Sequence, residues 1–227
     1  MSIWSRISDA LTALRQGQGL AAVFETLRTP PERTVGFTIA VIALSAKMAK
    51  ADGLVTRNEV AAFREIFHIP EGEERNAARV FNLARQDVAG FEHYAQRIGA
   101  MFDTDDGTLY LIMEGLFYIA VADGSYHPAE EEFLCRVAEI FGITGPRFES
   151  IRARFVPDAK PDPYTVLGVD PDMPLPEIRK VWRKLVRESH PDVMIARGVP
   201  EEAVKLSQKR MADINRAWEE IEARQAA

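Results

Sequence analysis

The segment RKVWRKLVRESHPDVM, residues 179–194, joins a strongly basic amphipathic stretch directly to His190-Pro191-Asp192. Apolar or small side chains recur at helical spacing on one face, which consists of Ile178, Trp182, Leu185 and Ser189, with Val181 and Val186 beside it. The exposed face is predicted to carry five basic residues, Arg179, Lys180, Arg183, Lys184 and Arg187, offset only by Glu177 and Glu188. Because Pro191 disfavours helical geometry at His190, the helix is predicted to stop there and to leave Asp192 in an exposed turn of a connecting loop.

Helical patterns flank this segment on both sides. Asp162 and Pro163 suit the N-cap and first position of a short helix that Gly168 would end. A longer helix is predicted from about Pro200 to Arg224, with an inner face made of Val204, Ser207, Met211, Ile214, Trp218 and Ile221. Two antiparallel helices braced by a short one would form a small helical hairpin that displays the His-Pro-Asp segment in its connection.

The His-Pro-Asp segment by itself allows several interpretations. A proline stop followed by a solvated loop explains it without any function. A metal site is disfavoured because His190 and Asp192 have no third ligand nearby. Nucleic-acid binding is disfavoured because no aromatic residue interleaves with the basic ones on the exposed face. The charge balance also disfavours nucleic-acid binding, because residues 162–227 carry 11 basic and 12 acidic groups and the whole chain has a net charge of −6.

Composition places the chain among ordinary globular proteins. Its 227 residues, 47% hydrophobic and 27% charged, suffice for one large or two small domains. The longest apolar run, Val35 to Ala46, is too short to span a bilayer and is predicted to form a buried core helix. Since the N-terminus lacks the features of a signal peptide, no transmembrane segment is expected and a cytoplasmic location is predicted, with peripheral association with the inner membrane left open.

The opening helix and the single cysteine both have structural interpretations. An opening helix is predicted to place one apolar face on the core rather than in a membrane interface, because its polar face has little basic excess. That face consists of Ile3, Trp4, Ile7, Leu11 and Leu14. The single cysteine, Cys135, excludes an intrachain disulfide and a multi-cysteine zinc site, and its apolar neighbours favour a buried structural thiol over a nucleophile.

An internal repeat precedes the hairpin. Residues 49–67 read AKADGLVTRNEVAAFREIF, and residues 120–141 read AVADGSYHPAEEEFLCRVAEIF. In each copy Ala-Asp-Gly is predicted to end a helix, because the glycine adopts positive φ there. The next helix then begins with a capping box over residues 56–59 in the first copy, and with His127, Pro128 and Glu130 at the cap, first and third positions in the second.

The repeated acidic residues, Asp52, Glu59, Asp123 and Glu130, admit a second interpretation as a cation site. Hard cations prefer convergent carboxylates. Local structure explains the same residues, because a capping box uses each Glu and a short Asp side chain accepts hydrogen bonds from turn backbone. We therefore expect structural roles for all four residues, with no bound metal and no cofactor.

Prolines indicate where the chain divides. The stretch VPDAKPDP, residues 156–163, is typical of a linker. The predicted organisation is an N-terminal helical extension (1–33), a helical bundle (34–155), a linker (156–161) and the C-terminal hairpin (162–227). No run shows a convincing strand alternation, so the predicted fold class is all-α.

The C-terminal module resembles the J domain of the DnaJ family over residues 162 to about 224. The resemblance rests on DPYTVLGV, EIRKVWRKLVRESHPD and INRAWEEI in that order. Trp182 and Trp218 stand where tyrosines are common, and both keep a large aromatic group with a polar atom. Glu188 and Ser189 stand where J domains often carry a basic and an aromatic residue. The long span from His190 to Trp218 is similar to J domains of the DjlA type.

The repeat resembles the TerB-like, tellurite-resistance-type helical domain over roughly residues 34–150. A TerB-like domain followed by a J domain is the layout of DjlA-type proteins. The sequence departs from that layout because it shows no N-terminal transmembrane segment. It also lacks the cysteine-rich zinc module and the Gly/Phe region of full DnaJ chaperones.

The resemblance implies a J-domain co-chaperone of a DnaK-type heat-shock chaperone. His190, Pro191 and Asp192 would stimulate ATP hydrolysis, the five basic residues would dock on the ATPase domain, and an unknown client or adaptor would bind the bundle. An enzyme is not expected, because the glycines of RQGQGL, residues 15–20, lack the strand and motif of a phosphate-binding loop and no nucleophile–base pair appears. The alternative is a TerB-type stress-response or metal-binding module with a silent J domain.

Overall fold

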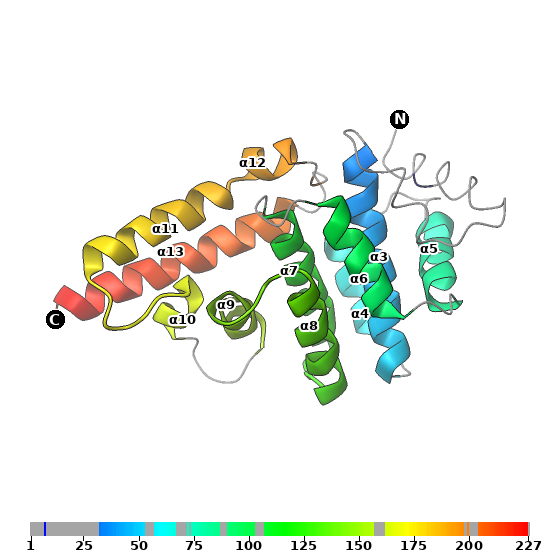
Figure 1. The fold of residues 1–227 in the computed structure, drawn as a ribbon, viewed down its shortest axis with the longest axis horizontal. Coiled ribbons are helices and arrows are strands. Elements are labelled where there is room, and N and C mark those ends of the chain that lie inside the picture. The colour runs from blue at the N-terminus through cyan, green and yellow to red at the C-terminus, as the bar shows by residue number, and fades with distance from the viewer. Residues whose placement is uncertain are drawn as a thin grey trace.

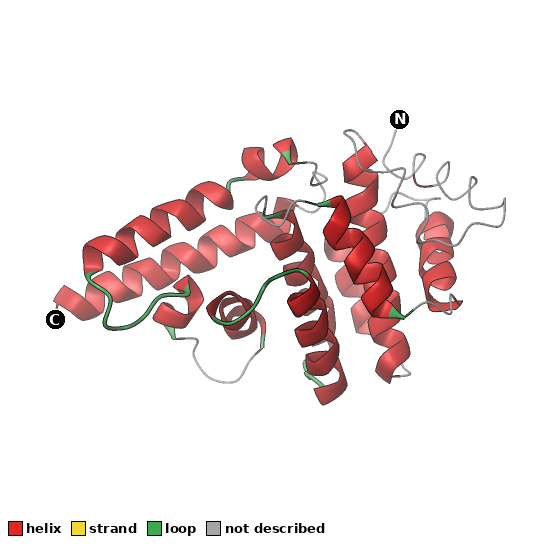
Figure 2. Cartoon of the chain, in the orientation of Figure 1, coloured by secondary structure: helices red, strands yellow, loops and turns green. Residues whose placement is uncertain are grey.

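A computed structural model describes residues 7, 32–52, 57–66, 72, 74–86, 90–102, 107–156, 162–197, 199 and 204–226. The described residues form helices and connecting turns, with no strand among them (Figure 2). The predicted all-α fold is confirmed. Within the opening helix only Ile7 is described, and its side chain is buried in the core.

Eleven α-helices and one short 3-10 helix cover the described ranges (Figure 1). In chain order they are α3 (Glu32–Asp52), α4 (Arg57–Ile66), α5 (Glu74–Gln86), α6 (Phe91–Met101), α7 (Thr108–Ala120), η2 (Val121–Asp123), α8 (Pro128–Ile140), α9 (Pro146–Phe155), α10 (Pro163–Leu167), α11 (Leu175–Glu188), α12 (Pro191–Ala196) and α13 (Val204–Ala226).

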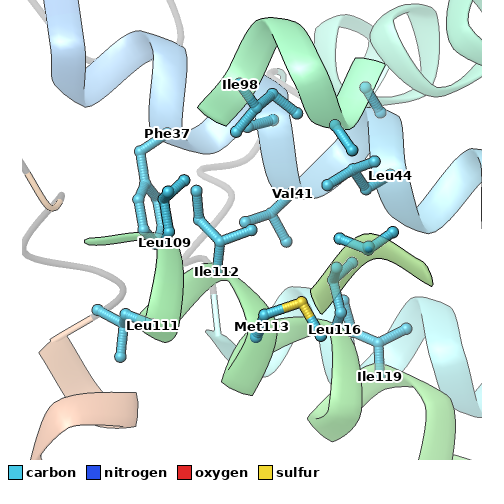
Figure 3. Packing of buried hydrophobic residues seen from close by; sticks show 14 of the residues in the cluster. Phe37, Val41, Leu44, Ile98, Leu109, Leu111, Ile112, Met113, Leu116 and Ile119 are labelled. Carbon is cyan, nitrogen blue, oxygen red and sulfur yellow. The ribbon is translucent and has the colours of Figure 1, made fainter. Parts of the chain in front are cut away.

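The first core lies within the N-terminal bundle, where α3 and α7 are apolar on nearly every side. The run Val35–Ala46 is buried throughout, which confirms the prediction of a core helix. Figure 3 shows Phe37, Val41 and Leu44 of α3 facing α7, with Ile98 of α6 above them. Full burial of an aliphatic or aromatic side chain stabilises a fold by about 1.5–3 kcal/mol, so this layer dominates the stability of the bundle.

The second copy of the repeat folds as the sequence predicts. Gly124 follows η2 with φ +86°, and the Asp123 carboxylate accepts a hydrogen bond from the Ser125 amide at 2.8 Å. The Glu130 carboxylate accepts from the His127 amide, also at 2.8 Å, at the start of α8. In the first copy the glycine and the threonine cap, at positions 53 and 56, lie outside the described residues.

The second core lies within the C-terminal hairpin, where α11 and α13 lie side by side and α10 packs across them (Figure 1). It consists of Val166, Leu167, Ile178, Ile214, Ala217, Trp218 and Ile221. The predicted start of α10 is confirmed, because the Asp162 carboxylate accepts from the Thr165 amide at 3.0 Å. Its end is confirmed by Gly168, whose φ is +65°.

Bundle and hairpin meet through buried polar groups as well as apolar ones. The Ser150 hydroxyl of α9 donates to the Val166 carbonyl of α10 at 2.6 Å. Glu114 of α7 forms a salt bridge with Arg154 of α9 within the bundle, and the Arg210 Nε atom of α13 lies 3.7 Å from the same carboxylate oxygen across the junction. All three charged side chains are at least nine-tenths buried. Val156, the C-cap of α9, is buried in the bundle core, and residues 157–161 lie outside the described residues.

The two tryptophans of the hairpin stack on each other. The Trp182 and Trp218 rings lie 5.1 Å apart, centroid to centroid, with 13° between their planes. The Trp182 Nε1–H group also donates to the Asn215 side-chain oxygen at 3.0 Å. Both residues therefore keep the aromatic core that tyrosines commonly provide in J domains, and Trp182 uses its polar atom to join α11 to α13.

The substitution Trp182→Phe is expected to lower the free energy of unfolding by about 1 kcal/mol more than Trp218→Phe does. Both changes shorten a ring of the same stack, but Trp182 also loses the hydrogen bond that it donates across the hairpin, whereas the more deeply buried Trp218 loses chiefly apolar contact. Urea unfolding of the full chain, followed by circular dichroism, measures both losses. Equal losses would show that the bond to Asn215 contributes nothing to stability.

Candidate functional site

The basic helix α11 presents its charges to solvent as the sequence predicts. Its apolar side rests on the hairpin core through Ile178, which is fully buried, and through the partly buried Trp182 and Leu185. No side chain caps its N-terminus, where Pro174 precedes the first turn. The five predicted basic residues are all exposed, namely Arg179, Lys180, Arg183, Lys184 and Arg187.

These five residues fall into two groups that the sequence did not separate. The lysines have acidic partners on their own helix, with Lys180 Nζ 2.7 Å from Glu177 and Lys184 Nζ 3.8 Å from Glu188. Arg179, Arg183 and Arg187 recur every four residues, and within the described part of the chain none of them forms an ion pair. We call these three residues the arginine stripe. Their guanidinium groups can reach an acidic partner without breaking an internal contact.

The His-Pro-Asp segment is not the exposed loop that the sequence predicts. It begins the short helix α12, with His190 as N-cap and Pro191 at the first helical position. The His190 Nδ1 atom accepts a hydrogen bond from the Asp192 amide at 3.2 Å. Pro191 therefore has two effects, because it stops α11 and its fixed φ also suits the first position of a new helix.

The side chains of His190 and Asp192 remain available to a partner. They are 52% and 87% exposed, and the His190 Nδ1 atom lies 3.7 Å from the Asp192 carboxylate. The carboxylate also lies in the first turn of α12, where negative charge is favoured. The structure thus places an exposed acid and an exposed imidazole close together at the start of α12, which follows directly on the basic helix.

A signal for α12 was present in the sequence. His127 and Pro128 are the same dipeptide, and there they were predicted to be the cap and first residue of a helix, which the structure confirms. At His190 and Pro191 the preceding basic helix led to the opposite interpretation, that of a stop alone. The acidic residue in the next position is a further mark of a helix start.

The two departures from the J-domain pattern also have local explanations. Ser189, the C-cap of α11, is fully buried, and its hydroxyl donates to the Leu185 carbonyl at 2.7 Å. An aromatic side chain would not fit in that position without rearrangement of α11 and its neighbours. Glu188 lies beside Lys184 and reduces the positive charge at this end of the helix.

The other candidate sites have structural roles in the described residues. The Glu130 carboxylate is 3% exposed and accepts from the His127 amide. Among the described residues, no three His, Cys, Asp or Glu side chains are close enough to hold a metal ion. Cys135 is half-buried, and burial together with Glu131 and Glu139 raises the pKa of its thiol, which disfavours the nucleophilic thiolate.

Comparison with known proteins identifies both parts of the chain. Residues 38–153, about half of the chain, match the family of tellurite resistance protein TerB, and residues 162–226 match the DnaJ domain. A relative from Coxiella burnetii, named co-chaperone protein DjlA, is 28% identical over 194 residues, which cover 77% of this chain and 72% of the relative. The chain belongs to the TerB family and to the DjlA type of J-domain proteins.

Further DjlA-type relatives align over most of both chains. The co-chaperone protein DjlA of Vibrio cholerae is 24% identical over 249 residues, covering 94% of this chain and 86% of the relative. That of Salmonella typhimurium is 23% identical over 263 residues, covering 97% of each. No solved structure matches the chain significantly. The predicted order, a TerB domain followed by a J domain, is shown by the two family matches.

The predicted cytoplasmic location is wrong. The relatives carry the name DjlA, which denotes a family of membrane-anchored co-chaperones. The prediction relied on the absence of a signal peptide and of an apolar span, and such absences do not determine where a protein resides. In the part of the chain that the structure describes, every helix is too short or too polar to cross a bilayer.

Proposed function

We propose that this chain is a co-chaperone that recruits a DnaK-type chaperone and stimulates its ATP hydrolysis. The observation that carries the proposal is the junction of α11 and α12, where exposed His190 and Asp192 follow directly on the arginine stripe. The relatives named co-chaperone protein DjlA support the same assignment. We call His190, Pro191 and Asp192 the trigger.

The two parts of the site act on different steps. The arginine stripe attracts an acidic surface of the chaperone and sets the register of docking, because surface charges chiefly govern encounter rate and orientation. The trigger then contacts the chaperone differently in its two conformations and shifts it toward the one that hydrolyses ATP. The reacting groups belong to the chaperone, so the proposed mechanism assigns no catalytic residue to this chain.

The domains that precede the hairpin determine where this activity occurs. We assign target selection to the bundle of residues 34–155, preceded by an extension over residues 1–33, and the chaperone contact to residues 162–227. A client or adaptor bound to the bundle would be placed beside a chaperone that has been recruited by α11. The bundle thus determines the target, and the hairpin supplies the regulatory contact.

Single-turnover ATP hydrolysis by the DnaK-type chaperone of the same organism tests the proposal. The rate is measured at increasing concentrations of the full chain, which separates the maximal stimulation from the concentration that gives half of it. A rise in rate that saturates supports a co-chaperone. A folded chain that leaves the rate unchanged at every concentration would refute the proposed function.

Replacing the whole arginine stripe with alanine is expected to raise the half-stimulating concentration about tenfold at low salt, with the maximal stimulation unchanged. The matched control is the double substitution Lys180→Ala/Lys184→Ala on the same helix, where each lysine already has an acidic partner. The control is expected to have a much smaller effect. Both effects should be smaller at high salt, because the Debye length, over which exposed charges interact, falls to about 3 Å at 1 M. Equal effects of the two variants would contradict the division into two groups.

A further inference from the structure

The trigger and the arginine stripe rest on different cores. The stripe belongs to α11, whose buried residue Ile178 lies in the hairpin core. The trigger begins α12, whose buried residue Met194 is fully enclosed in the bundle core, with Val193 packed against the same cluster. Although α12 lies within the J domain along the sequence, its anchoring side chain is inserted into the TerB domain.

The contact between α12 and the bundle is made at the start of α7. Gly107, the N-cap of α7, has φ +78°. A Cβ atom placed on this glycine would lie 2.7 Å from Arg197 Nη1 and 3.8 Å from Met194 Cε. The guanidinium group that follows α12 and the methyl group of Met194 therefore lie directly against the backbone of the bundle. The end of α12 therefore contacts the bundle at the start of α7.

The first turns of α13 also connect α12 to the bundle. Leu206 of α13 is buried in the bundle core and lies 3.5 Å from the position that a Cβ on Gly115 of α7 would take. One turn later, the Arg210 guanidinium lies 4.2 Å from the Tyr110 ring centroid and near Glu114. Because α12 contacts α13, whose first turns pack on α7, it has a second connection to the bundle.

We propose that the TerB bundle positions the trigger, and that Met194 is the positioning residue through which it acts. The trigger must meet the chaperone in a fixed geometry relative to the arginine stripe, and the docking of α12 on the bundle sets that geometry. The inference rests on the proposed co-chaperone function. It gives the bundle a part in stimulating hydrolysis that is separate from target selection.

The test compares three full-length variants in the single-turnover assay. Met194→Ala removes the anchor, and Met194→Leu keeps a side chain of similar volume, which cores tolerate well. Met48→Ala is the matched control, because Met48 is equally buried in the same core. Phe37 lies beside Leu109, near the start of α7, and Leu44 lies farther along (Figure 3). Met48 follows one turn after Leu44 and is therefore remote from Gly107.

Met194→Ala is expected to reduce the maximal stimulation about fivefold while the half-stimulating concentration, set by the stripe, stays within about twofold. Met194→Leu restores the stimulation, and Met48→Ala retains it. Hydrogen exchange provides a readout independent of activity: the amides of residues 194 and 197 should exchange faster in Met194→Ala, while those of α11 are unchanged. These amides donate to carbonyls of α12 and its cap at 3.1 Å in the intact protein.

Two different failures can be told apart. If the unmodified chain gives no stimulation, the proposed function fails and this inference falls with it. If the unmodified chain stimulates and Met194→Ala does so as strongly as Met48→Ala, the co-chaperone function stands and the positioning role is refuted. A purely structural role for Met194 would also be revealed, because both alanine variants would then lose activity in proportion to their loss of stability.

Discussion

The substitution Asp192→Asn is expected to abolish the stimulation of ATP hydrolysis without altering the fold. The Asp192 side chain is 87% exposed, and its carboxylate lies 3.7 Å from the His190 Nδ1 atom, which accepts a hydrogen bond from the Asp192 amide, so the fold loses little when the charge is removed. In a desolvated interface, removal of one partner of a charge pair costs about 2–5 kcal/mol, which corresponds to on the order of 30-fold or more in the chaperone's response. The measurement is the single-turnover rate at saturating co-chaperone.

The companion residue His190 separates a direct contact from a capping effect. His190→Gln removes the Nδ1 acceptor that holds the Asp192 amide, and with it the imidazole. His190→Asn also removes the imidazole but supplies a side chain that caps helices well. If stimulation is lost in both, the imidazole itself contacts the chaperone. If only the glutamine variant is inactive, His190 acts by beginning α12. Full activity of Asp192→Asn would contradict the proposed trigger.

The sequence predicts the long elements of the site because its periodic pattern is strong there. The apolar face of residues 178–189 and the inner face of α13 are both found where expected. Helix α12 was missed because six residues hold too few turns for a period to be recognised, and Pro191 was interpreted only as a stop. Its anchor on the bundle could not be predicted at all, because nothing near Met194 in the sequence indicates which core will enclose it.

The division of the basic face into two groups could not be predicted from the sequence, for a related reason. Spacing alone shows that Lys180 and Lys184 lie within reach of acidic residues on the same helix, but rotamers decide which pairs form. The structure pairs both lysines and leaves the arginine stripe to solvent. The departure at Ser189 was noticed from the J-domain pattern, whereas its buried hydrogen bond to Leu185 required coordinates.

The buried charges around Glu114 also show what the sequence alone cannot predict. Glu114 is the single acid within TLYLIMEGLFYIA, residues 108–120, and an acid on so apolar a helix requires a partner. Its partners, Arg154 and Arg210, are contributed by α9 and α13, far along the chain. A lone buried acid can therefore be recognised from sequence, but the element that neutralises it cannot. Here Arg154 belongs to the bundle itself, and Arg210 of α13 provides the charged contact from the hairpin.

The substitution Glu114→Met is expected to lower the free energy of unfolding by about 3–5 kcal/mol, because it leaves a buried guanidinium without a counter-charge. Burial alone would lower the pKa of Arg154, but attraction to the Glu114 carboxylate outweighs it and raises that pKa. The side chains of Glu114 and Arg154 are 1% and 2% exposed, so water cannot replace the lost partner. Urea unfolding of the full chain measures the loss. Thermal unfolding should show a fall in Tm of roughly 10 °C.

Two further variants show whether the loss reflects an uncompensated charge. The double substitution Glu114→Met/Arg154→Met is expected to recover part of the stability, because it removes the Arg154 charge together with its partner, whereas the buried Arg210 guanidinium still lacks Glu114. Recovery is favoured here because Glu114 Oε2 and Arg154 Nη1 have no hydrogen-bond partner within the described residues. Glu139→Ala, which breaks the exposed pair with Arg136, should cost less than about 1 kcal/mol. A double variant as unstable as Glu114→Met would mean that the loss comes from packing around residue 114 or from the unpaired Arg210, and not from the Arg154 charge.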